Sequence, residues 1–161
     1  MKLQELIDKL GLEPLQGEGG MFCRTYACAD EINGRTIGTA IYYLLDEDTF
    51  SHLHLLDADE IYHFYLGDPV ELYQLTADGE MTMTILGHDL AAGESVQTLV
   101  PKGVWQGSRL AAGGKWALLG TTMSPGYEQS GYTHANREEL IKLFPKYDEV
   151  IKLITYRFPL S

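Results

Sequence analysis

The feature that most constrains the fold is a series of short β-type segments separated by turn signals. From about residue 20 onward, runs rich in aromatic and β-branched residues end repeatedly at turns that contain Gly, Asp or Asn. Asn33-Gly34 and Asp78-Gly79 are dipeptides typical of tight hairpins. Roughly eight strands at this spacing favour a sandwich or barrel over units that alternate strands with helices. The sequence therefore predicts an all-β body.

Helical patterns occur only toward the two ends of the chain. Four apolar residues near the N-terminus recur at helical spacing, namely Leu3, Leu6, Ile7 and Leu10. Gly11 follows them as a natural C-terminal stop. Near the other end, Asn136 is a plausible N-cap and Glu139 follows three residues later, as in a capping box. We expect one domain (1–161), with a β body at about 20–125 and a helical tail at about 135–155.

Composition and charge narrow the classes of partner. The chain has 161 residues and a formal net charge of −11, and its 12 Lys and Arg are scattered rather than clustered. This pattern argues against nucleic acid and against an anionic membrane surface, but a single arginine in a pocket can still hold a small anion. The first residues lack an apolar signal-peptide core, and Cys23 and Cys28 match no redox or zinc spacing. We expect a cytoplasmic protein whose partner is a small-molecule ligand.

The stretch from Phe50 to Pro69 holds the strongest candidate for chemistry. His52 and His54 are two residues apart, so on a strand they share one face, and Glu60 follows after a short turn. Two imidazoles and a carboxylate can hold a divalent metal such as Fe, Mn, Ni or Zn. Two simpler interpretations stay open: a buried His–Glu hydrogen bond, and a hydrogen-bonded or exposed strand position for His52.

These residues resemble the first cupin motif, in which H-x-H is followed by Glu and then by Gly. Here the motif reads His52-x-His54, Glu60 and Gly67, and the gap between His54 and Glu60 is longer than usual. In the cupins this motif supplies metal ligands, so the resemblance implies a possible metal set of His52, His54 and Glu60.

A second motif is similar to the later cupin motif but lacks its histidine. Gly93, Pro101 and Gly103 match the expected positions, whereas Gln106 stands where metal-binding cupins carry their last histidine. A glutamine amide is a weak ligand for such metals, although it can hydrogen-bond an organic ligand. In a jelly roll this position lies opposite the first motif, which implies that Gln106 faces the cavity.

Longer blocks make the resemblance more specific. "GLEPLQGEGGMFCRTY", "DEIYHFYLGDPVEL" and "LVPKGVWQGSRL" closely resemble blocks of the cupin-5 type, a family of unknown function, and the similarity runs from about Leu6 to Ile154. The family implies a double-stranded β-helix, or cupin jelly roll, usually as a homodimer. Its members tend to carry Trp-His-Arg where this chain has Leu53-His54-Leu55, so His54 is the family histidine and His52 is an addition.

Three further residues are candidates for the ligand cavity. Tyr62 and Phe64 share the phase of Glu60 on the predicted strand and would form an aromatic wall suited to a sugar, a base or another flat ligand. Arg24 is a candidate anion anchor if the N-terminal strand reaches the cavity mouth. Core packing for the aromatics and a surface position for Arg24 are the competing interpretations.

Three functions follow from these patterns. The first is a small-molecule binder or an epimerase-like or isomerase-like enzyme in which His54 acts as base and Tyr62 as acid, by analogy with cupin sugar-nucleotide epimerases. The second is a metal-dependent dioxygenase or isomerase that uses His52, His54 and Glu60. The third is a non-catalytic metabolite-binding module. Whether the chain is an enzyme is left open by the sequence.

Overall fold

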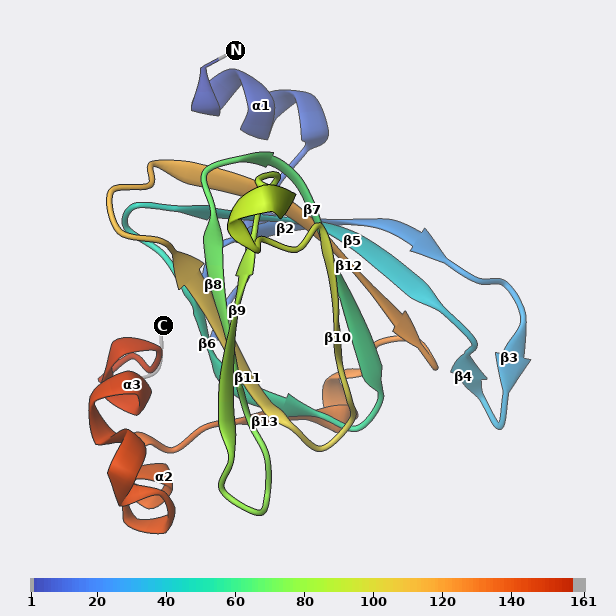
Figure 1. The fold of residues 1–161 in the computed structure, drawn as a ribbon. Helices are drawn as coiled ribbons and strands as arrows, with labels where there is room; N and C mark the ends of the chain where they lie inside the picture. The colour runs from blue at the N-terminus through green and yellow to red at the C-terminus, as the bar shows by residue number, and fades with distance from the viewer. Residues whose placement is uncertain (1, 158–161) are drawn as a thin grey trace.

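The computed structural model describes residues 2–157 and confirms the predicted cupin jelly roll. Two antiparallel sheets face each other, with a helix near the N-terminus and helices near the C-terminus (Figure 1). The strands are β1 (Glu13–Pro14), β2 (Met21–Ala27), β3 (Glu31–Ile32), β4 (Arg35–Thr36), β5 (Thr39–Asp46), β6 (Ser51–Leu56), β7 (Asp59–Gly67), β8 (Val70–Leu75), β9 (Met81–Leu86), β10 (Gln97–Val100), β11 (Trp105–Leu110), β12 (Trp116–Ser124) and β13 (Tyr132–His134). The helices are α1 (Leu3–Leu10), α2 (Arg137–Leu143) and α3 (Asp148–Leu153).

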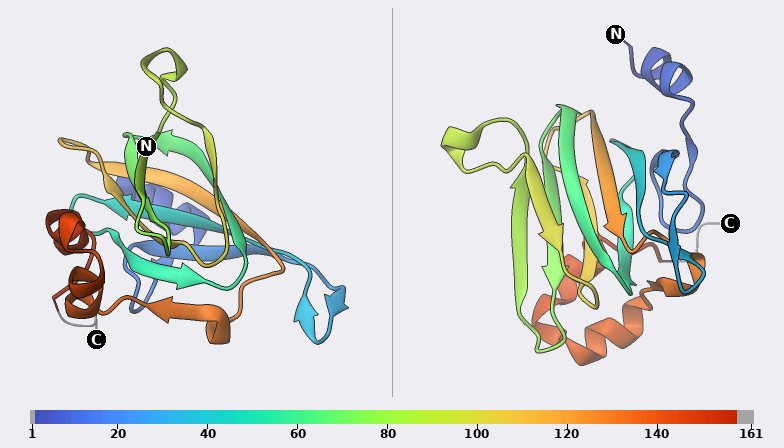
Figure 2. Two further views of the ribbon diagram at one scale, coloured as in Figure 1. Left: turned by 60° about the horizontal axis from the view of Figure 1, so that its bottom comes forward. Right: turned by 90° about the vertical axis from the view of Figure 1, so that its right-hand side faces the viewer.

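Two larger sheets form the body of the domain. One has the strand order β1-β2-β5-β12-β7-β10, and the other has the order β13-β6-β11-β8-β9. Figure 2 shows the two sheets as layers with the α2–α3 region below one of them. Strands far apart in sequence are therefore neighbours, as with β5, β12 and β7, so residues from distant regions of the chain can face one interior space.

The predicted hairpin at Asn33-Gly34 is present. Asn33 has φ 55° and Gly34 has φ 80°, which is the left-handed backbone that a type I′ turn needs and that Asn and Gly tolerate best. The turn joins the two-residue strands β3 and β4, and the chain then enters β5, which pairs with β2. This places the N-terminal strand beside the centre of the larger sheet.

The space between the sheets divides into a packed core and a cavity. Leucine, valine and aromatic side chains fill the packed part, where Tyr43, Leu45, Leu72, Val100 and Leu119 are each at most 1% exposed. Burial of this kind contributes about 1.5–3 kcal/mol for each large apolar side chain. The packed core fixes the two sheets relative to each other, so the side chains at the open end are held by a rigid frame.

The end helices cover the outer faces of the sheets. Leu6 of α1 packs near Leu44 and Leu118 on the larger sheet, and α2 and α3 pack near Leu53 on the smaller one. The predicted N-cap of α2 is confirmed, because the Asn136 side chain accepts a hydrogen bond from the Glu139 backbone N–H at 3.1 Å. Among residues 2–157, no helix is long and apolar enough to cross a membrane.

Candidate functional site

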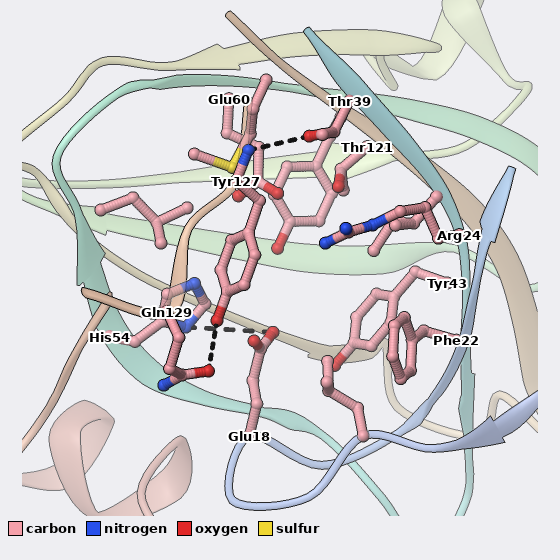
Figure 3. Close-up of a pocket in the computed structure, with 15 residues that line it drawn as sticks. Glu18, Phe22, Arg24, Thr39, Tyr43, His54, Glu60, Thr121, Tyr127 and Gln129 are labelled. Carbon is pink, nitrogen blue, oxygen red and sulfur yellow. Dashed lines mark hydrogen bonds and ion pairs between the residues drawn. The ribbon is translucent and has the colours of Figure 1, made fainter. Parts of the chain in front are cut away.

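A cavity of about 180 Å³ lies between the sheets at the end away from the packed core. Its lining comes from the loop before β2, from β2, β5, β6, β7 and β12, and from the loop after β12. Figure 3 shows His54, Glu18 and Tyr127 facing one another on one side and Arg24 reaching in from another. Aromatic and aliphatic walls surround a few polar groups, as in many sites for small organic ligands.

His54 is the central polar residue of the cavity. It is 2% exposed on β6, and its Nδ1–H donates to the backbone carbonyl of His52 at 2.7 Å. That bond fixes the tautomer, so the neutral ring presents Nε2 as an acceptor. No described residue hydrogen-bonds this nitrogen. The ring also stacks on Tyr132 with centroids 5.0 Å apart. The structure thus places His54 in the cavity wall, where the sequence predicts it.

Glu18 is a site residue that the sequence reasoning missed. Its Oε1 accepts a hydrogen bond from Ser51 Oγ at 2.8 Å and lies 4.0 Å from His54 Nδ1. The Glu18 backbone carbonyl accepts from the His52 N–H at 2.8 Å, so the loop is tied to the start of β6 at two points.

Glycines on both sides of Glu18 allow the loop to approach β6 so closely. Gly19 has φ 102°, and a Cβ there would overlap the carbonyl oxygen of Phe50 and lie 2.6 Å from the hydroxyl of Tyr156. Gly17 also has a positive φ, 82°, but the space around it is open. A single charged residue between glycines, in "QGEGG", is the signal that could have pointed to this loop.

Glu60 and Tyr62 extend from β7 into the same cavity, as predicted. Glu60 is 7% exposed, and its Oε2 is buried without a hydrogen-bond partner among the described residues. Burial raises the pKa of the Glu60 carboxyl above its ordinary value, and the nearby His54 opposes that shift. Burial also raises the pKa of the Tyr62 phenol well above its usual range, so the phenol stays protonated at neutral pH.

Gln106 was expected to face the cavity, but it is not among the residues that line it. It is 1% exposed on β11, directly across from His54 of β6 in the sheet register. Its Oε1 is also buried without a partner among residues 2–157. The side chain is close enough to Glu60 to stabilise the ionised carboxyl, and this lowers the Glu60 pKa against the effect of burial.

Phe64 is not part of the cavity. It is 5% exposed in the packed core. Its ring and that of His88 are arranged edge to face, with centroids 4.8 Å apart. Along β7 it lies four residues beyond Glu60, a distance of about 13 Å on an extended strand, so it shares the face but not the position. Of the predicted aromatic wall, Tyr62 lines the cavity and Phe64 serves the core.

The mouth is formed by residues from two distant segments. Arg24 of β2 lines it, and its guanidinium points into the cavity (Figure 3). Tyr127, in the loop after β12, donates from its hydroxyl to Gln129 Oε1 at 2.9 Å, and its backbone N–H donates to Thr39 Oγ1 at 2.9 Å. The sequence reasoning missed Tyr127 and Gln129, because nothing local marks a loop as adjacent to β2 and β6.

His52 lies in a different environment from His54. It is 2% exposed, and both ring nitrogens are used: Nε2–H donates to the Ala135 carbonyl at 3.0 Å, and Nδ1 accepts from the Tyr156 N–H at 2.9 Å. The ring stacks on His134 with centroids 3.7 Å apart. Burial lowers the pKa of His52 to about 4. This corresponds to the simpler interpretation of a hydrogen-bonded strand histidine.

The structure does not bring His52, His54 and Glu60 together as a metal-ligand set. The lone pair of His52 Nδ1 is already engaged, and its Nε2 carries the proton given to Ala135. Within residues 2–157, no three His, Cys, Asp or Glu side chains form a group suited to a metal ion. The residues of this chain therefore do not fit the three-ligand centre that the cupin motif implied.

Solved structures share this fold over its whole length. Protein SO0799 from Shewanella oneidensis is 33% identical, with 97% of this chain and 98% of that chain covered and a TM-score of 0.92. A hypothetical protein from Leishmania major is 27% identical over 98% and 100% of the two chains, also at 0.92. A variant of Bacillus subtilis oxalate decarboxylase shares only the fold, at 11% identity over 93% and 40% and a TM-score of 0.59. No functionally curated protein matches the chain.

The family comparison agrees with the motifs and with the fold. The model of the Cupin_5 family, described as cupin superfamily (DUF985), matches residues 4–135, which include every residue that lines the cavity. The long gap between His54 and Glu60 and the glutamine at position 106 are thus features of a chain that keeps the jelly roll without the histidine set of metal-binding cupins. The chain belongs to the Cupin_5 family of the cupin superfamily.

Proposed function

We propose that the cavity binds a small polar metabolite with a single ring, of the size of a monosaccharide. The observation that carries this proposal is that His54 Nε2 and Glu60 Oε2, both without protein partners among residues 2–157, belong to side chains that line one buried cavity. A buried polar atom without a partner costs about 1–3 kcal/mol, and a bound ligand that supplies the partner recovers this energy.

The size of the cavity supports a single ring. An apolar protein cavity of about 150 Å³ accommodates one benzene molecule. The cavity here is slightly larger, at about 180 Å³. A nucleotide would have to leave most of its atoms outside, so for a sugar nucleotide only the sugar would enter.

The chemistry of the walls supports a sugar over a purely aromatic ligand. Phe22, Tyr43 and Tyr127 supply ring faces on which the C–H face of a sugar can pack. Glu60 and Thr121 supply acceptors for hydroxyl groups. A flat hydrocarbon would leave those acceptors without partners.

Binding can be tested with saturation-transfer NMR on the full chain, using D-glucose, D-galactose and L-rhamnose as probes. We expect at least one sugar to bind, and we expect a His54→Ala, Glu60→Ala double variant to lose that binding. A His63→Ala, Glu71→Ala variant, changed on β7 and β8 outside the cavity, is the matched control. Full retention of sugar binding by the double variant would remove the proposal.

A second candidate, acid–base isomerisation, is favoured by the way His54 is held. Its Nδ1–H is occupied by the His52 carbonyl, which leaves Nε2 free to take a proton from a carbon next to a carbonyl group. Glu18, 4.0 Å from Nδ1, would stabilise the imidazolium that forms. Tyr62 would donate its phenolic proton to the carbonyl oxygen, which gives an enediol. The His54 imidazolium would then give a proton to the neighbouring carbon, and the Tyr62 phenolate would take back a hydroxyl proton, so the substrate is isomerised and both residues return to their starting states.

Carbon-bound deuterium distinguishes the enzyme from a non-catalytic module. A ketose such as D-fructose, incubated with the protein in D₂O, should incorporate deuterium beside its carbonyl if His54 acts as a base. The His54→Gln variant should lose the exchange, whereas the His63→Gln variant should keep it. Tight binding of the ketose without exchange would instead identify a metabolite-binding module and rule out this second candidate.

A further inference from the structure

Arg24 is a cation that reaches the cavity without an acidic partner among residues 2–157. The ion pairs among residues 2–157 include Arg35, several lysines and His54 but not Arg24. Its guanidinium points into the cavity from β2 (Figure 3). Arg24 is exposed at the mouth, so in a chain with a net charge of −11 its guanidinium is accessible to an anionic group of a ligand that enters the cavity.

Glu60 makes the opposite demand on a ligand. Its Oε2 is buried without a partner among the described residues. A carboxyl oxygen in this state accepts hydrogen bonds, so this region of the cavity calls for hydroxyl or amine donors on the ligand. The ligand therefore needs acidic and donor groups at different positions.

The sheet sets the separation between these two positions. Arg24 lies on β2 and Glu60 on β7, and β5 and β12 lie between them in the larger sheet. Three strand spacings of about 4.8 Å place the two backbones about 14 Å apart. Both side chains line the same cavity, so a ligand that contacts both of them must extend across the width of β5 and β12.

We propose that the ligand is a sugar acid: a single polyol ring with one carboxylate, held by Arg24, and with hydroxyl groups that donate to Glu60. This inference rests on the proposed function and specifies its ligand class. A planar guanidinium pairs with a carboxylate through two parallel hydrogen bonds, whereas a phosphate on the same ring adds bulk to a cavity of about 180 Å³.

Three sugars that differ chiefly in charge test the assignment. D-glucuronate, D-glucose and D-glucosamine are titrated into the full chain at pH 7 by calorimetry or by NMR. We expect D-glucuronate to bind about tenfold more tightly than D-glucose, and D-glucosamine to bind more weakly than D-glucuronate. The Arg24→Gln variant should remove the preference for D-glucuronate and leave the affinity for D-glucose unchanged, and Arg24→Lys should keep part of it. Arg109→Gln, on β11 outside the cavity, is the matched control.

Glu60→Gln separates the two roles. Because Glu60 is assigned to hydroxyl groups that all three sugars share, this variant should weaken all three to a similar extent, whereas Arg24→Gln acts on the acid alone. Equal binding of D-glucose and D-glucuronate, unchanged by Arg24→Gln, would overturn the sugar-acid assignment and leave the proposed sugar site standing. Tighter binding of D-glucose 6-phosphate than of D-glucuronate would also overturn it. Absence of binding by every sugar would instead refute the proposed function.

Discussion

Acidification should destabilise this protein through His52, because the folded state holds that imidazole neutral. Burial lowers the pKa of His52 from 6.5 to about 4, and both ring nitrogens are hydrogen-bonded in the neutral form. Between these two values the unfolded chain binds a proton that the folded chain does not. The stabilising contribution is therefore complete above pH 6.5 and is lost as the pH falls toward 4.

The magnitude follows from the two pKa values. At pH 5, protonation of this imidazole multiplies the statistical weight of the unfolded state by about 33 and that of the folded state by about 1.1. The free energy of unfolding is therefore about 2 kcal/mol lower at pH 5 than at pH 8. Glu60 acts in the opposite sense, because a raised pKa favours the folded state at low pH. The effect of His52 must therefore be isolated as a difference between proteins.

Urea unfolding at pH 8 and at pH 5 provides that difference. The wild type should lose about 2 kcal/mol more than His52→Asn between the two pH values, whatever the absolute stability of the variant. His88→Gln, which removes an exposed imidazole, should behave as the wild type does. Equal losses in the wild type and in His52→Asn would refute the reasoning. So would an NMR titration in which the His52 ring gains its proton near pH 6.5.

Three further changes test the frame around the site, each by urea or thermal unfolding. Gly19→Ala should cost about 2–3 kcal/mol, because a Cβ there meets backbone in a left-handed conformation, whereas Gly17→Ala, with open space, should cost about 1 kcal/mol; equal costs would contradict this. Leu53→Ala, fully buried under α2 and α3, should cost about 2–5 kcal/mol, and a loss below 1 kcal/mol would mean that the helices pack loosely. Asn136→Ala should cost about 1 kcal/mol through the lost cap of α2, and Asn136→Asp should retain most of it.

Strand alternation correctly predicts which side chains face the interior, but not which of them line the cavity. His54, Glu60 and Tyr62 were predicted to face one interior, and they do, because alternation along a strand is a local property of the backbone. Phe64 has the correct face, but its distance along β7 places it in the packed core. Alternation identifies a face and does not say where along that face the cavity ends.

Glu18 and His52 required the tertiary structure. Glu18 reaches His54 only because the loop that carries it, 33 residues before Ser51, hydrogen-bonds to Ser51. His52 does not join the expected metal set, because its two ring nitrogens are hydrogen-bonded to the Ala135 carbonyl and the Tyr156 N–H. These two groups lie 83 and 104 residues further along the chain. No pattern within a short window of sequence encodes such contacts.

The sequence by itself determined the class of fold, the hairpin at Asn33-Gly34, the caps of the end helices and the family, because each depends on local backbone preference or on a motif with fixed spacing. The tertiary structure decided which polar residues meet. The order β2-β5-β12-β7 brings Arg24 and Glu60 to one cavity. Backbone groups of Ala135 and Tyr156 hydrogen-bond both ring nitrogens of His52. The physical reason is that hydrogen bonds and burial act between atoms in space, and in a jelly roll most neighbours in space are distant in sequence.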